Sequence, residues 1–462
     1  MTLRLNQLIL EILLILVKKS DMPQTLKLNR KITTFNKKIS IDGDKSLSIR
    51  WALLASQANG KSRAYKILRS EDVLSTLSCL KTLGIKVKMN KEYCEIIGKG
   101  LNGYKYKNNL ILNAGNSGTL GRLLLGLLVH ANKKIKLIGD ESLSKRDFSR
   151  VTDPLNKFGA TFFYKKKGNL PLSILGVSPS KPIKFNEKKG SAQCKSSVML
   201  AALNTKGETL IKAKKSRDHT ELLFKYLKIP IKIKKTKNFD YIKINGQKEF
   251  SSFNYTIPSD ISSSAFFIVL TALSKNSKLL IKNVNINPSR TGILMILKKM
   301  GVRILLKNKK SYKGEKVADI FIKSVKNLKA INCPSNLNSS AIDEFLLIFL
   351  VAAKAKGVSY FKDLSELNQK ESPRLDWGSK ILNMMGIKTK LTKNSIKIYG
   401  QPNLEIKKPI IIKDYLKDHR VFMMSTIAAL TYGGQWKIHD KDSINTSFPS
   451  FLNIIKKISS KP

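Results

Sequence analysis

The segment Gly43–Arg50, which reads GDKSLSIR, carries the residue types of an anion-binding site. Backbone N–H groups at a helix start lack partners and lie at the positive end of the helix dipole, so they attract phosphate or carboxylate groups. Lys45 and Arg50 add full positive charges, and Ser46 adds a hydroxyl donor. An ordinary capped helix has the same residue types, so this segment alone leaves both interpretations open. Asp44 precedes Lys45 where a Walker-type loop has glycine, which excludes that motif.

Similar clusters recur further along the chain. Three glycines precede Arg122 in NAGNSGTLGR, where they allow a backbone to approach a ligand closely. Lys370, Glu371 and Arg374 lie together in KESPR, and such cations bind phosphate and carboxylate by point-charge and bidentate contacts. Asp343 begins another apolar segment, but an acidic residue there usually compensates the helix dipole. Single clusters therefore do not separate a binding role from a structural one.

The clusters follow an internal repeat. Six times, a small or polar helix start leads into an apolar helix, a turn and a basic strand-like segment. These starts are Asp44, Asn116, Ser191, Asp260, Asp343 and Asp418. They lie about 70–80 residues apart, as in a repeated structural unit, and an amphipathic helix usually ending at glycine follows each apolar one. We predict six β-α-β-α-β-β units in two domains of three, with apolar helices inside and their starts converging on one anion-binding cleft that needs no metal.

Composition leaves a nucleic-acid binder as an alternative. The formal net charge is +53, from 85 Lys and Arg against 32 Asp and Glu, which would suit a nucleic-acid partner. The lysines are spread through nearly every segment, so a lysine-rich composition explains them too, and the sequence shows no evident aromatic-studded basic sheet. The four cysteines lack CxxC spacing and the four histidines form no cluster, which indicates neither disulfides nor zinc.

The beginning of the chain is treated separately. The apolar segment LILEILLILV at 8–17 is too short to span a bilayer, and no small-residue cleavage site follows it. We expect residues 1–21 to be an extension, with Met22 as an alternative start, and the protein to be cytoplasmic with no membrane partner. Cys194 is expected to be a small buried residue, and His219 to form a capping pair with Asp218 or to act as a base.

Nine segments resemble, in order, the signatures of the enolpyruvyl transferase family. They are GDKSLSIR, NAGNSGTLGRLL, GDESLSKR, SAQCKSSVMLAAL, SRDHTE, NPSRTG, IDE, KESPRL and DHRVFM. The resemblance implies an α/β (α+β) fold, a two-domain inside-out α/β barrel of six βαβαββ repeats. It implies one domain of residues 22–43 plus 260–462 and another of residues 44–259.

The resemblance also implies a reaction and its residues. The enolpyruvyl group of phosphoenolpyruvate would pass to the 5-hydroxyl of shikimate 3-phosphate, releasing phosphate, on the way to chorismate and aromatic amino acids. Asp343 would take the hydroxyl proton and Glu371 would protonate the methylene, with Lys45 assisting; one carboxylate of raised pKa and one ionised carboxylate would serve this best. The implied shikimate 3-phosphate ligands are Lys45, Ser46, Arg50, Ser191, Ala192, Gln193, Arg217, Asp343 and Lys370. The implied phosphoenolpyruvate ligands are Lys45, Asn116, Gly118, Thr119, Arg122, Arg146, Gln193, Arg374 and Arg420.

The same resemblance implies no cofactor or metal, a monomer, and no nucleic-acid partner. Because Gly118 has no methyl group, glyphosate is expected to compete with phosphoenolpyruvate. Two alternatives stay open. One is the family member that acts on UDP-N-acetylglucosamine, although its reactive loop cysteine and its Lys-Asn pair, at the place of Lys45-Ser46, are missing here. The other is a basic nucleic-acid-binding repeat protein.

Overall fold

Six helices that are apolar on nearly every side form the interior of the molecule, as the sequence predicts. The computed structural model describes residues 24–460, so the expectation for residues 1–21 lies outside the described residues. Every residue of helix α9 is buried, and in α12 only the last residue is not, as expected for a helix without a polar face. The six are α2 (Lys45–Gln57), α4 (Gly118–Leu127), α7 (Ala192–Leu203), α9 (Ile261–Leu273), α12 (Phe345–Lys354) and α14 (His419–Tyr432).

A second helix follows each apolar one and buries one of its faces. In α10, for example, Met295 is half exposed while Leu294 and Ile296 are buried. These second helices are α3 (Glu71–Thr82), α6 (Ser149–Asn156), α8 (His219–Tyr226), α10 (Gly292–Lys299), α13 (Arg374–Met384) and α15 (Phe451–Ser459). Short helices are α5 (Glu141–Ser144), α11 (Asn338–Ala341), η1 (Leu128–His130), η2 (Ser335–Leu337), η3 (Ser365–Gln369) and η4 (Lys441–Thr446).

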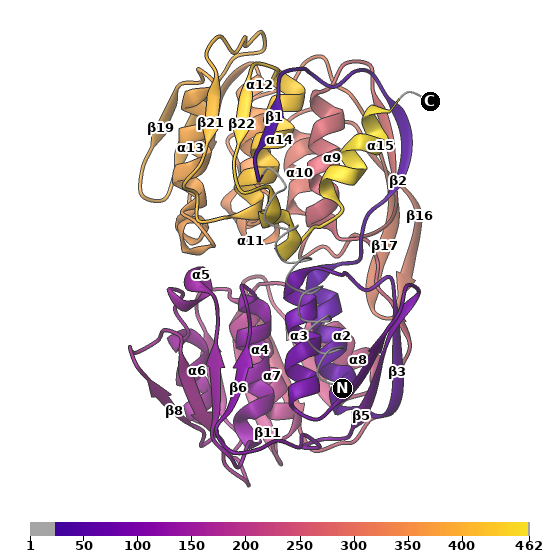
Figure 1. The fold of residues 1–462 in the computed structure, drawn as a ribbon, viewed down its shortest axis with the longest axis vertical. Coiled ribbons are helices and arrows are strands. Elements are labelled where there is room, and N and C mark those ends of the chain that lie inside the picture. The colour runs from indigo at the N-terminus through magenta and orange to yellow at the C-terminus, as the bar shows by residue number, and fades with distance from the viewer. Residues whose placement is uncertain (1–23, 461–462) are drawn as a thin grey trace, which may run out of the picture.

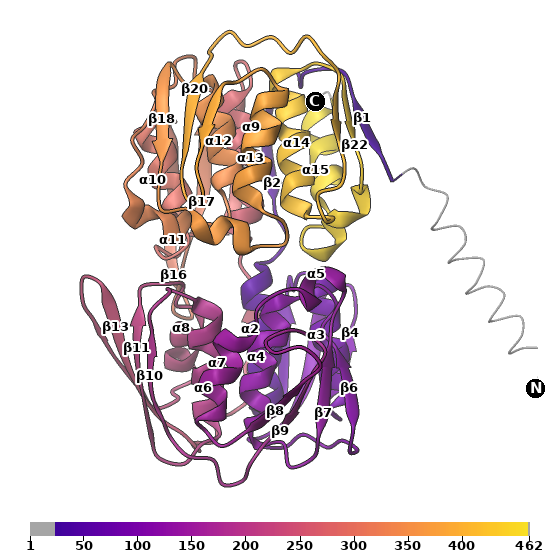
Figure 2. The same cartoon turned by 90° about the vertical axis from the view of Figure 1, so that its left-hand side faces the viewer.

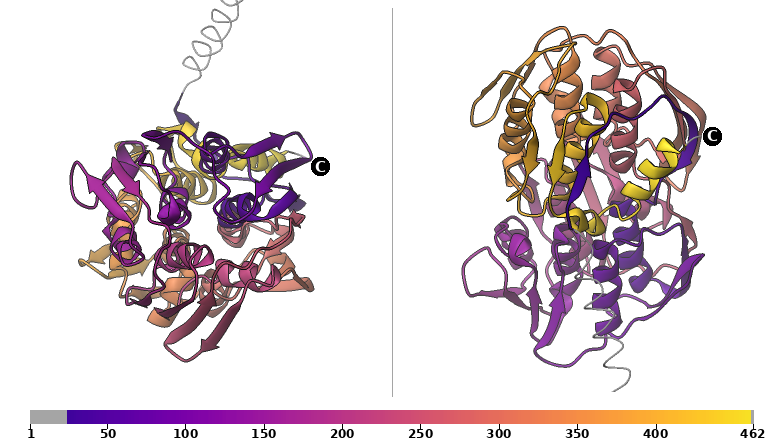
Figure 3. Two further views of the ribbon diagram at one scale, coloured as in Figure 1. Left: turned by 90° about the horizontal axis from the view of Figure 1, so that it is seen from below. Right: turned by 45° about the horizontal axis from the view of Figure 1, so that its top comes forward.

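Two lobes are arranged one above the other (Figure 1). The core of the lower lobe is drawn from residues 47–257, and the core of the upper lobe from residues 35–41 and 261–458. In each lobe the strands lie outside the helices, as the turned view shows (Figure 2), and the view from below shows strands around the edge of the lower lobe (Figure 3). No helix within residues 24–460 has the length and apolarity needed to cross a membrane.

Three four-stranded sheets cover the lower lobe, in the orders β14-β3-β5-β4, β6-β7-β9-β8 and β10-β11-β13-β12. The first pair in each order is parallel and the other pairs are antiparallel. The strands are β3 (Asn59–Tyr65), β4 (Lys86–Met89), β5 (Tyr93–Lys99), β6 (Leu110–Asn113), β7 (Ile135–Ile138), β8 (Thr161–Tyr164), β9 (Leu172–Leu175), β10 (Lys184–Glu187), β11 (Glu208–Lys214), β12 (Ile231–Lys235), β13 (Phe239–Asn245) and β14 (Tyr255–Thr256).

Three further sheets cover the upper lobe, in the orders β16-β17-β15-β2, β18-β20-β19 and β1-β22-β21. Strands β1 and β2 come from the beginning of the chain and appear as indigo segments in this lobe (Figure 1). The strands are β1 (Leu26–Leu28), β2 (Asn36–Ser40), β15 (Lys278–Asn285), β16 (Ile304–Tyr312), β17 (Glu315–Lys323), β18 (Gly357–Phe361), β19 (Thr389–Leu391), β20 (Ile396–Gly400), β21 (Ile410–Ile412) and β22 (Trp436–Ile438).

Only the second half of the segment KITTFNKKIS, at 31–40, forms a strand. Strand β2 begins at Asn36, because this residue pairs with Lys278, the first residue of the partner strand β15. Strand β1 was not predicted. It has only three residues, too few for a period-2 pattern, and it completes the sixth sheet by pairing antiparallel with β22.

The chain passes between the lobes at two adjacent places. The amide of Asp44 donates to the carbonyl of Pro258 at 2.8 Å, and the amide of Asp260 donates to the carbonyl of Asp42 at 3.1 Å. Only glycine fits at position 43, since a Cβ there would lie 2.1 Å from the carbonyl oxygen of Lys66. The two crossings are therefore joined by their own backbones.

Candidate active site

Helix starts in five of the six units are capped by a side chain, although in the second unit the cap is Ser117 and not the predicted Asn116. Asp44, Ser117, Ser191, Asp260 and Asp418 each accept a backbone N–H of the first turn, which satisfies donors that a helix start otherwise leaves free. Helix α12 is the exception. It begins at Phe345, after Glu344, whose side chain makes no capping bond.

Asp343 lies next to α12 and faces four cations. Its carboxylate pairs with Arg217 of the lower lobe, with Lys370 Nζ at 3.3 Å and with Arg374 Nη1 at 3.5 Å. Arg420 Nη1 donates to its carbonyl oxygen at 2.7 Å. Burial opposes ionisation, but Lys370 and the three arginines outweigh it and hold the pKa of Asp343 well below its ordinary value. The sequence left Asp343 open as a dipole-compensating cap, whereas the structure places it in a cationic cluster.

Glu371 is the second carboxylate of this cluster. It pairs with Arg374 and lies 3.3 Å from Nη2 of Arg146, which comes from the lower lobe. Burial again raises its pKa, but Arg374 and Arg146 lower it by more, so the pKa is well below its ordinary value. The expectation of one raised and one ionised carboxylate is therefore wrong for Asp343 and Glu371 in this structure. The sequence could not show how many arginines would surround Glu371.

The guanidinium of Arg374 is held in place by Asp418. It is fully buried, and Asp418 accepts from its Nε at 2.8 Å and from its Nη2 at 3.1 Å. Such a two-point contact fixes the plane of a guanidinium. Asp418 was noted in the sequence only as a helix start, so its role as the support of Arg374 was missed.

Lys45 lies on the lower side of the site, at the first turn of α2. Its Nζ is 2.9 Å from Oδ2 of Asp72. Asp72 lies at the start of α3 and was not predicted, because an acidic residue in a first helical turn looks like an ordinary cap. Lys45 is also among the charges that lower the pKa of Glu371, so the two catalytic candidates share one electrostatic environment.

Several predicted phosphoenolpyruvate ligands form one chain of contacts in the lower lobe. Arg122 Nη1 donates to Gln193 Oε1 at 2.6 Å, and Gln193 Nε2 donates to Thr119 Oγ1 at 3.0 Å. Burial and the nearby Arg146 lower the pKa of Arg122 to about 10. Gly118 lies against both arginines, so the structure brings these five residues together.

Four other predicted ligands lie in the lower lobe. Asn116 donates to Asp140 at 2.6 Å, Ser191 caps α7, and Ala192 is the first residue of that helix. Arg50 points into the lower lobe, where it donates to Thr220 Oγ1 at 2.9 Å and Ser196 Oγ at 3.2 Å.

Arg50 is only 4% exposed, and its Nη1 donates to the carbonyl of Ser46.

His219 and Cys194 do not belong to the site. His219 is buried against Glu315, with 2.6 Å between Nδ1 and Oε1, and Asp218 does not cap α8 with its side chain but accepts from Asn287 at 2.9 Å. The expected Asp-His capping pair is therefore wrong. Cys194 is buried, as expected, and burial raises the pKa of its thiol. Within residues 24–460 no group of three or more His, Cys, Asp or Glu side chains could hold a metal ion.

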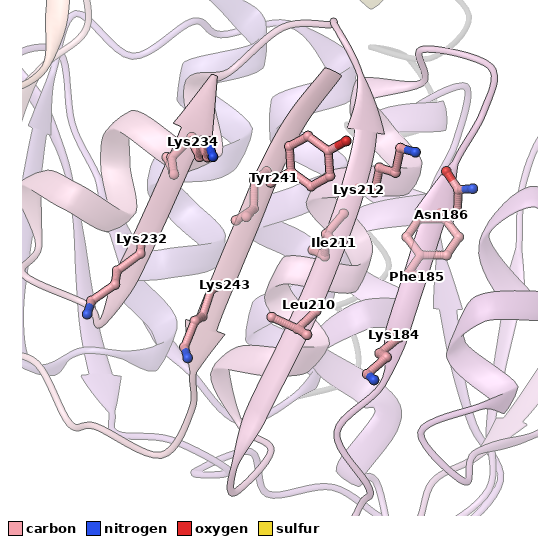
Figure 4. Close-up of a pocket in the computed structure, with 12 residues that line it drawn as sticks. Lys184, Phe185, Asn186, Leu210, Ile211, Lys212, Lys232, Lys234, Tyr241 and Lys243 are labelled. Atoms are coloured by element: carbon pink, nitrogen blue, oxygen red, sulfur yellow. The ribbon is translucent and has the colours of Figure 1, made fainter. Parts of the chain in front are cut away.

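A cavity of about 540 Å³ lies elsewhere, on the sheet β10-β11-β13-β12 (Figure 4). It is lined by Lys184, Phe185, Asn186, Leu210, Ile211, Lys212, Lys232, Ile233, Lys234, Tyr241, Ile242 and Lys243. None of the predicted site residues is among them. The ammonium of Lys212 lies 4.8 Å from the ring centre of Phe239 and 5.8 Å from that of Tyr241. A basic sheet that carries aromatic rings is therefore present, although no sheet of this kind was evident in the sequence.

Comparisons with known proteins agree with the fold and the motifs. A sequence model of the family described as EPSP synthase (3-phosphoshikimate 1-carboxyvinyltransferase) matches residues 29–455. The 3-phosphoshikimate 1-carboxyvinyltransferase of Ruthia magnifica is 40% identical over 421 residues, covering 91% of this chain and 94% of the relative. That of Petrotoga mobilis is 39% identical over 429 residues, covering 92% and 97%.

Solved structures give the same result. The EPSP synthase from Acinetobacter baumannii superposes with a TM-score of 0.82 at 34% identity, covering 94% of this chain and 98% of that one. The enolpyruvyl transferase NikO from Streptomyces tendae shares the fold, with a TM-score of 0.75 at 14% identity and coverage of 95% and 98%. The fold is thus that of the enolpyruvyl transferases, and the predicted two-domain α/β class is confirmed. Within that class, the chain belongs to the EPSP synthase family.

Proposed function

We propose that this protein transfers the carboxyvinyl group of phosphoenolpyruvate to the 5-hydroxyl of shikimate 3-phosphate. The observation that carries the proposal is the pairing of Asp343 and Glu371, from the upper lobe, with Arg217 and Arg146, from the lower lobe. Both substrates are multiply anionic, and a site lined with cations from two lobes suits them.

The proposed ligands form two sets, which share Lys45 and Gln193. Phosphoenolpyruvate would be held by Arg122, Arg146, Arg374 and Arg420, assisted by Asn116, Gly118, Thr119, Gln193 and Lys45. Shikimate 3-phosphate would be held by Lys45, Ser46, Arg50, Ser191, Ala192, Gln193, Arg217, Asp343 and Lys370. Bound phosphate and carboxylate groups would compete with Glu371 for Arg146 and Arg374. Since those cations lower the pKa of Glu371, sharing them with a substrate raises that pKa toward the range of a proton donor.

The reaction then proceeds by addition and elimination. Glu371 protonates the methylene carbon of phosphoenolpyruvate, and the 5-oxygen, having given its proton to Asp343, bonds to the adjacent carbon. Glu371 then takes back a methyl proton and the double bond forms again. The bond to the phosphate oxygen breaks, and phosphate leaves with the proton held by Asp343. Lys45 neutralises charge that develops during these steps. A proton-transfer group contributes about 10²–10⁴ in rate, so the cations that stabilise developing charge must supply much of the remainder.

Shikimate 3-phosphate is favoured over UDP-N-acetylglucosamine as the acceptor. The second acceptor implies a reactive cysteine on a loop, whereas the chain's cysteines, Cys79, Cys94, Cys194 and Cys333, are all buried. Burial raises the thiol pKa of Cys79 and Cys94 to about 12 in each case, which leaves little reactive thiolate at neutral pH.

The protein is further proposed to act as a cytoplasmic monomer without a nucleic-acid partner. Because the proposed ligands come from both lobes, neither lobe alone should be active.

The test measures phosphate released from phosphoenolpyruvate with shikimate 3-phosphate, with UDP-N-acetylglucosamine, and with no acceptor. Release only with shikimate 3-phosphate, together with a product heavier by one carboxyvinyl group, is expected. Release only with UDP-N-acetylglucosamine would contradict the proposal and identify that compound as the acceptor. No release with either, combined with tight RNA binding at physiological salt, would refute it.

A further inference from the structure

Arg290 joins the two places where the chain passes between the lobes. It lies in the connection between β15 and α10 and is 2% exposed. Its Nη1 is 3.2 Å from Oδ2 of Asp44, the cap of α2, and its Nη2 is 3.3 Å from Oδ1 of Asp260, the cap of α9. One guanidinium thus holds the first helix of the lower lobe and the first helix of the upper lobe.

The same contacts reach the proposed catalytic lysine. The second carboxylate oxygen of Asp260 accepts from the backbone amide of Lys45 at 3.2 Å. Asp260 therefore links Arg290 to the residue at the first position of α2. A planar guanidinium makes two contacts in fixed relative directions, which a lysine ammonium cannot reproduce. The position of Lys45 relative to the upper lobe thus depends on the two-point contact of the Arg290 guanidinium with Asp44 and Asp260.

A second set of contacts leads from Arg290 to a proposed phosphoenolpyruvate ligand. Arg290 Nη2 donates to Ser262 Oγ at 2.7 Å, and Ser262 donates to Glu344. The same oxygen of Glu344, Oε1, lies 3.8 Å from Nη1 of Arg420, and this nitrogen donates to the carbonyl of Asp343. Glu344 is buried, and burial raises the pKa of its carboxyl although Arg420 and Arg290 oppose this shift.

A third contact fixes the orientation of Arg290. Its Nη1 lies 3.3 Å from Nε2 of His219, whose Nδ1 is 2.6 Å from Oε1 of Glu315. When Nδ1–H donates to Glu315, Nε2 is left as an acceptor for Arg290. His219 belongs to the lower lobe and Glu315 to the upper lobe, so this contact also spans the crossing.

We infer that Arg290 is a positioning residue that sets the spacing between Lys45 and Arg420 through Asp260, Ser262 and Glu344. The inference rests on the proposed function only for its kinetic readout. It assigns a role to a residue that contacts neither reacting group and that lies outside the set of proposed substrate ligands.

The test compares Arg290→Lys with Arg303→Lys, an exposed arginine of the same lobe. Arg290→Lys keeps the charge but loses the two-point contact. We expect kcat to fall about tenfold or more and the KM for phosphoenolpyruvate to rise, while the melting temperature stays close to that of the wild type. Arg303→Lys is expected to match the wild type. A merely structural role would lower the melting temperature and leave kcat per folded molecule unchanged.

A second variant covers the case in which Arg290→Lys does not fold. Ser262→Ala removes only the link from Arg290 to Glu344 and is expected to raise the KM for phosphoenolpyruvate several-fold. If Arg290→Lys folds and has the kcat and KM of the wild type, the inference is overturned. If Arg290→Lys does not fold, a Ser262→Ala protein with wild-type kcat and KM overturns it. If the wild type itself lacks transferase activity, the proposed function fails. X-ray scattering then decides on Arg290: an Arg290→Lys protein with a larger radius of gyration supports its role between the lobes, and an unchanged radius contradicts it.

Discussion

Substitution of Gly118 by alanine tests how closely the anion-binding arginines pack. A Cβ at this position would lie 3.0 Å from Arg146 Nη1, 3.2 Å from Arg122 Nη1 and 3.6 Å from Leu143 Cδ1. The first two distances are shorter than ordinary carbon–nitrogen contacts, so both guanidinium groups must move by a few tenths of an ångström. The helix itself tolerates alanine, which is favoured over glycine by up to about 1 kcal/mol. The cost therefore falls on the arginines and not on the fold.

The size of the effect follows from the bonds these arginines would make. A charge-assisted hydrogen bond contributes about 1.5–3 kcal/mol, so loss of about half of one such bond weakens binding of a small anion by about three- to tenfold. We expect the inhibition constant of glyphosate, measured in competition with phosphoenolpyruvate by phosphate release, to rise by about this factor in Gly118→Ala. The KM for phosphoenolpyruvate should rise as well, while the melting temperature should not fall. Equal inhibition constants for the wild type and the variant would refute the reasoning.

Three further predictions concern other parts of the protein. Glu371→Gln should bind both substrates but turn over at least about 10²-fold more slowly; near-normal turnover would remove Glu371 from the mechanism. Gly43→Ala should lower the free energy of unfolding by about 2 kcal/mol or more, because its Cβ would lie 2.1 Å from the carbonyl oxygen of Lys66. An unchanged urea midpoint would contradict this, since it would mean that the backbone at the crossing moves to make room for the methyl group. The pKa of Asp343 is lower in the folded protein than in the unfolded chain, where it is near 4. The ionised carboxylate therefore stabilises the fold fully at pH values above about 4, and this stabilisation is lost as the pH falls toward the pKa of the folded state. The stability difference between the wild type and Asp343→Asn should thus be constant near pH 7 and shrink below pH 4; a difference that grows there would contradict this sign.

The sequence predicted most of the fold because the repeat and the apolar helices are local properties. Helix α9, for example, shows its buried character in an uninterrupted run of apolar and small residues. Strand β1 was missed since three residues carry no usable period. The joining of the two crossings by Arg290 could not be predicted, because it depends on a contact between residues 246 positions apart.

The site was only partly predictable for a related reason. The types of Lys370, Glu371 and Arg374 indicate anion chemistry from the sequence alone. Their charge states depend on neighbours from distant segments, such as Arg146 of the other lobe. The same holds for Asp72, whose pairing with Lys45 at 2.9 Å has no separate signal in the sequence.

The proposed transfer of the enolpyruvyl group proceeds by addition and elimination, with Glu371 as the proton donor. The direct measurement is the reaction in D₂O, followed by mass spectrometry of the vinyl CH₂ group of the product. A transient methyl group that gains a solvent deuteron and then loses one hydrogen leaves deuterium in that CH₂ group, and Glu371→Gln should abolish this incorporation under the same conditions. Product that forms at the wild-type rate without deuterium in its vinyl group would contradict the account.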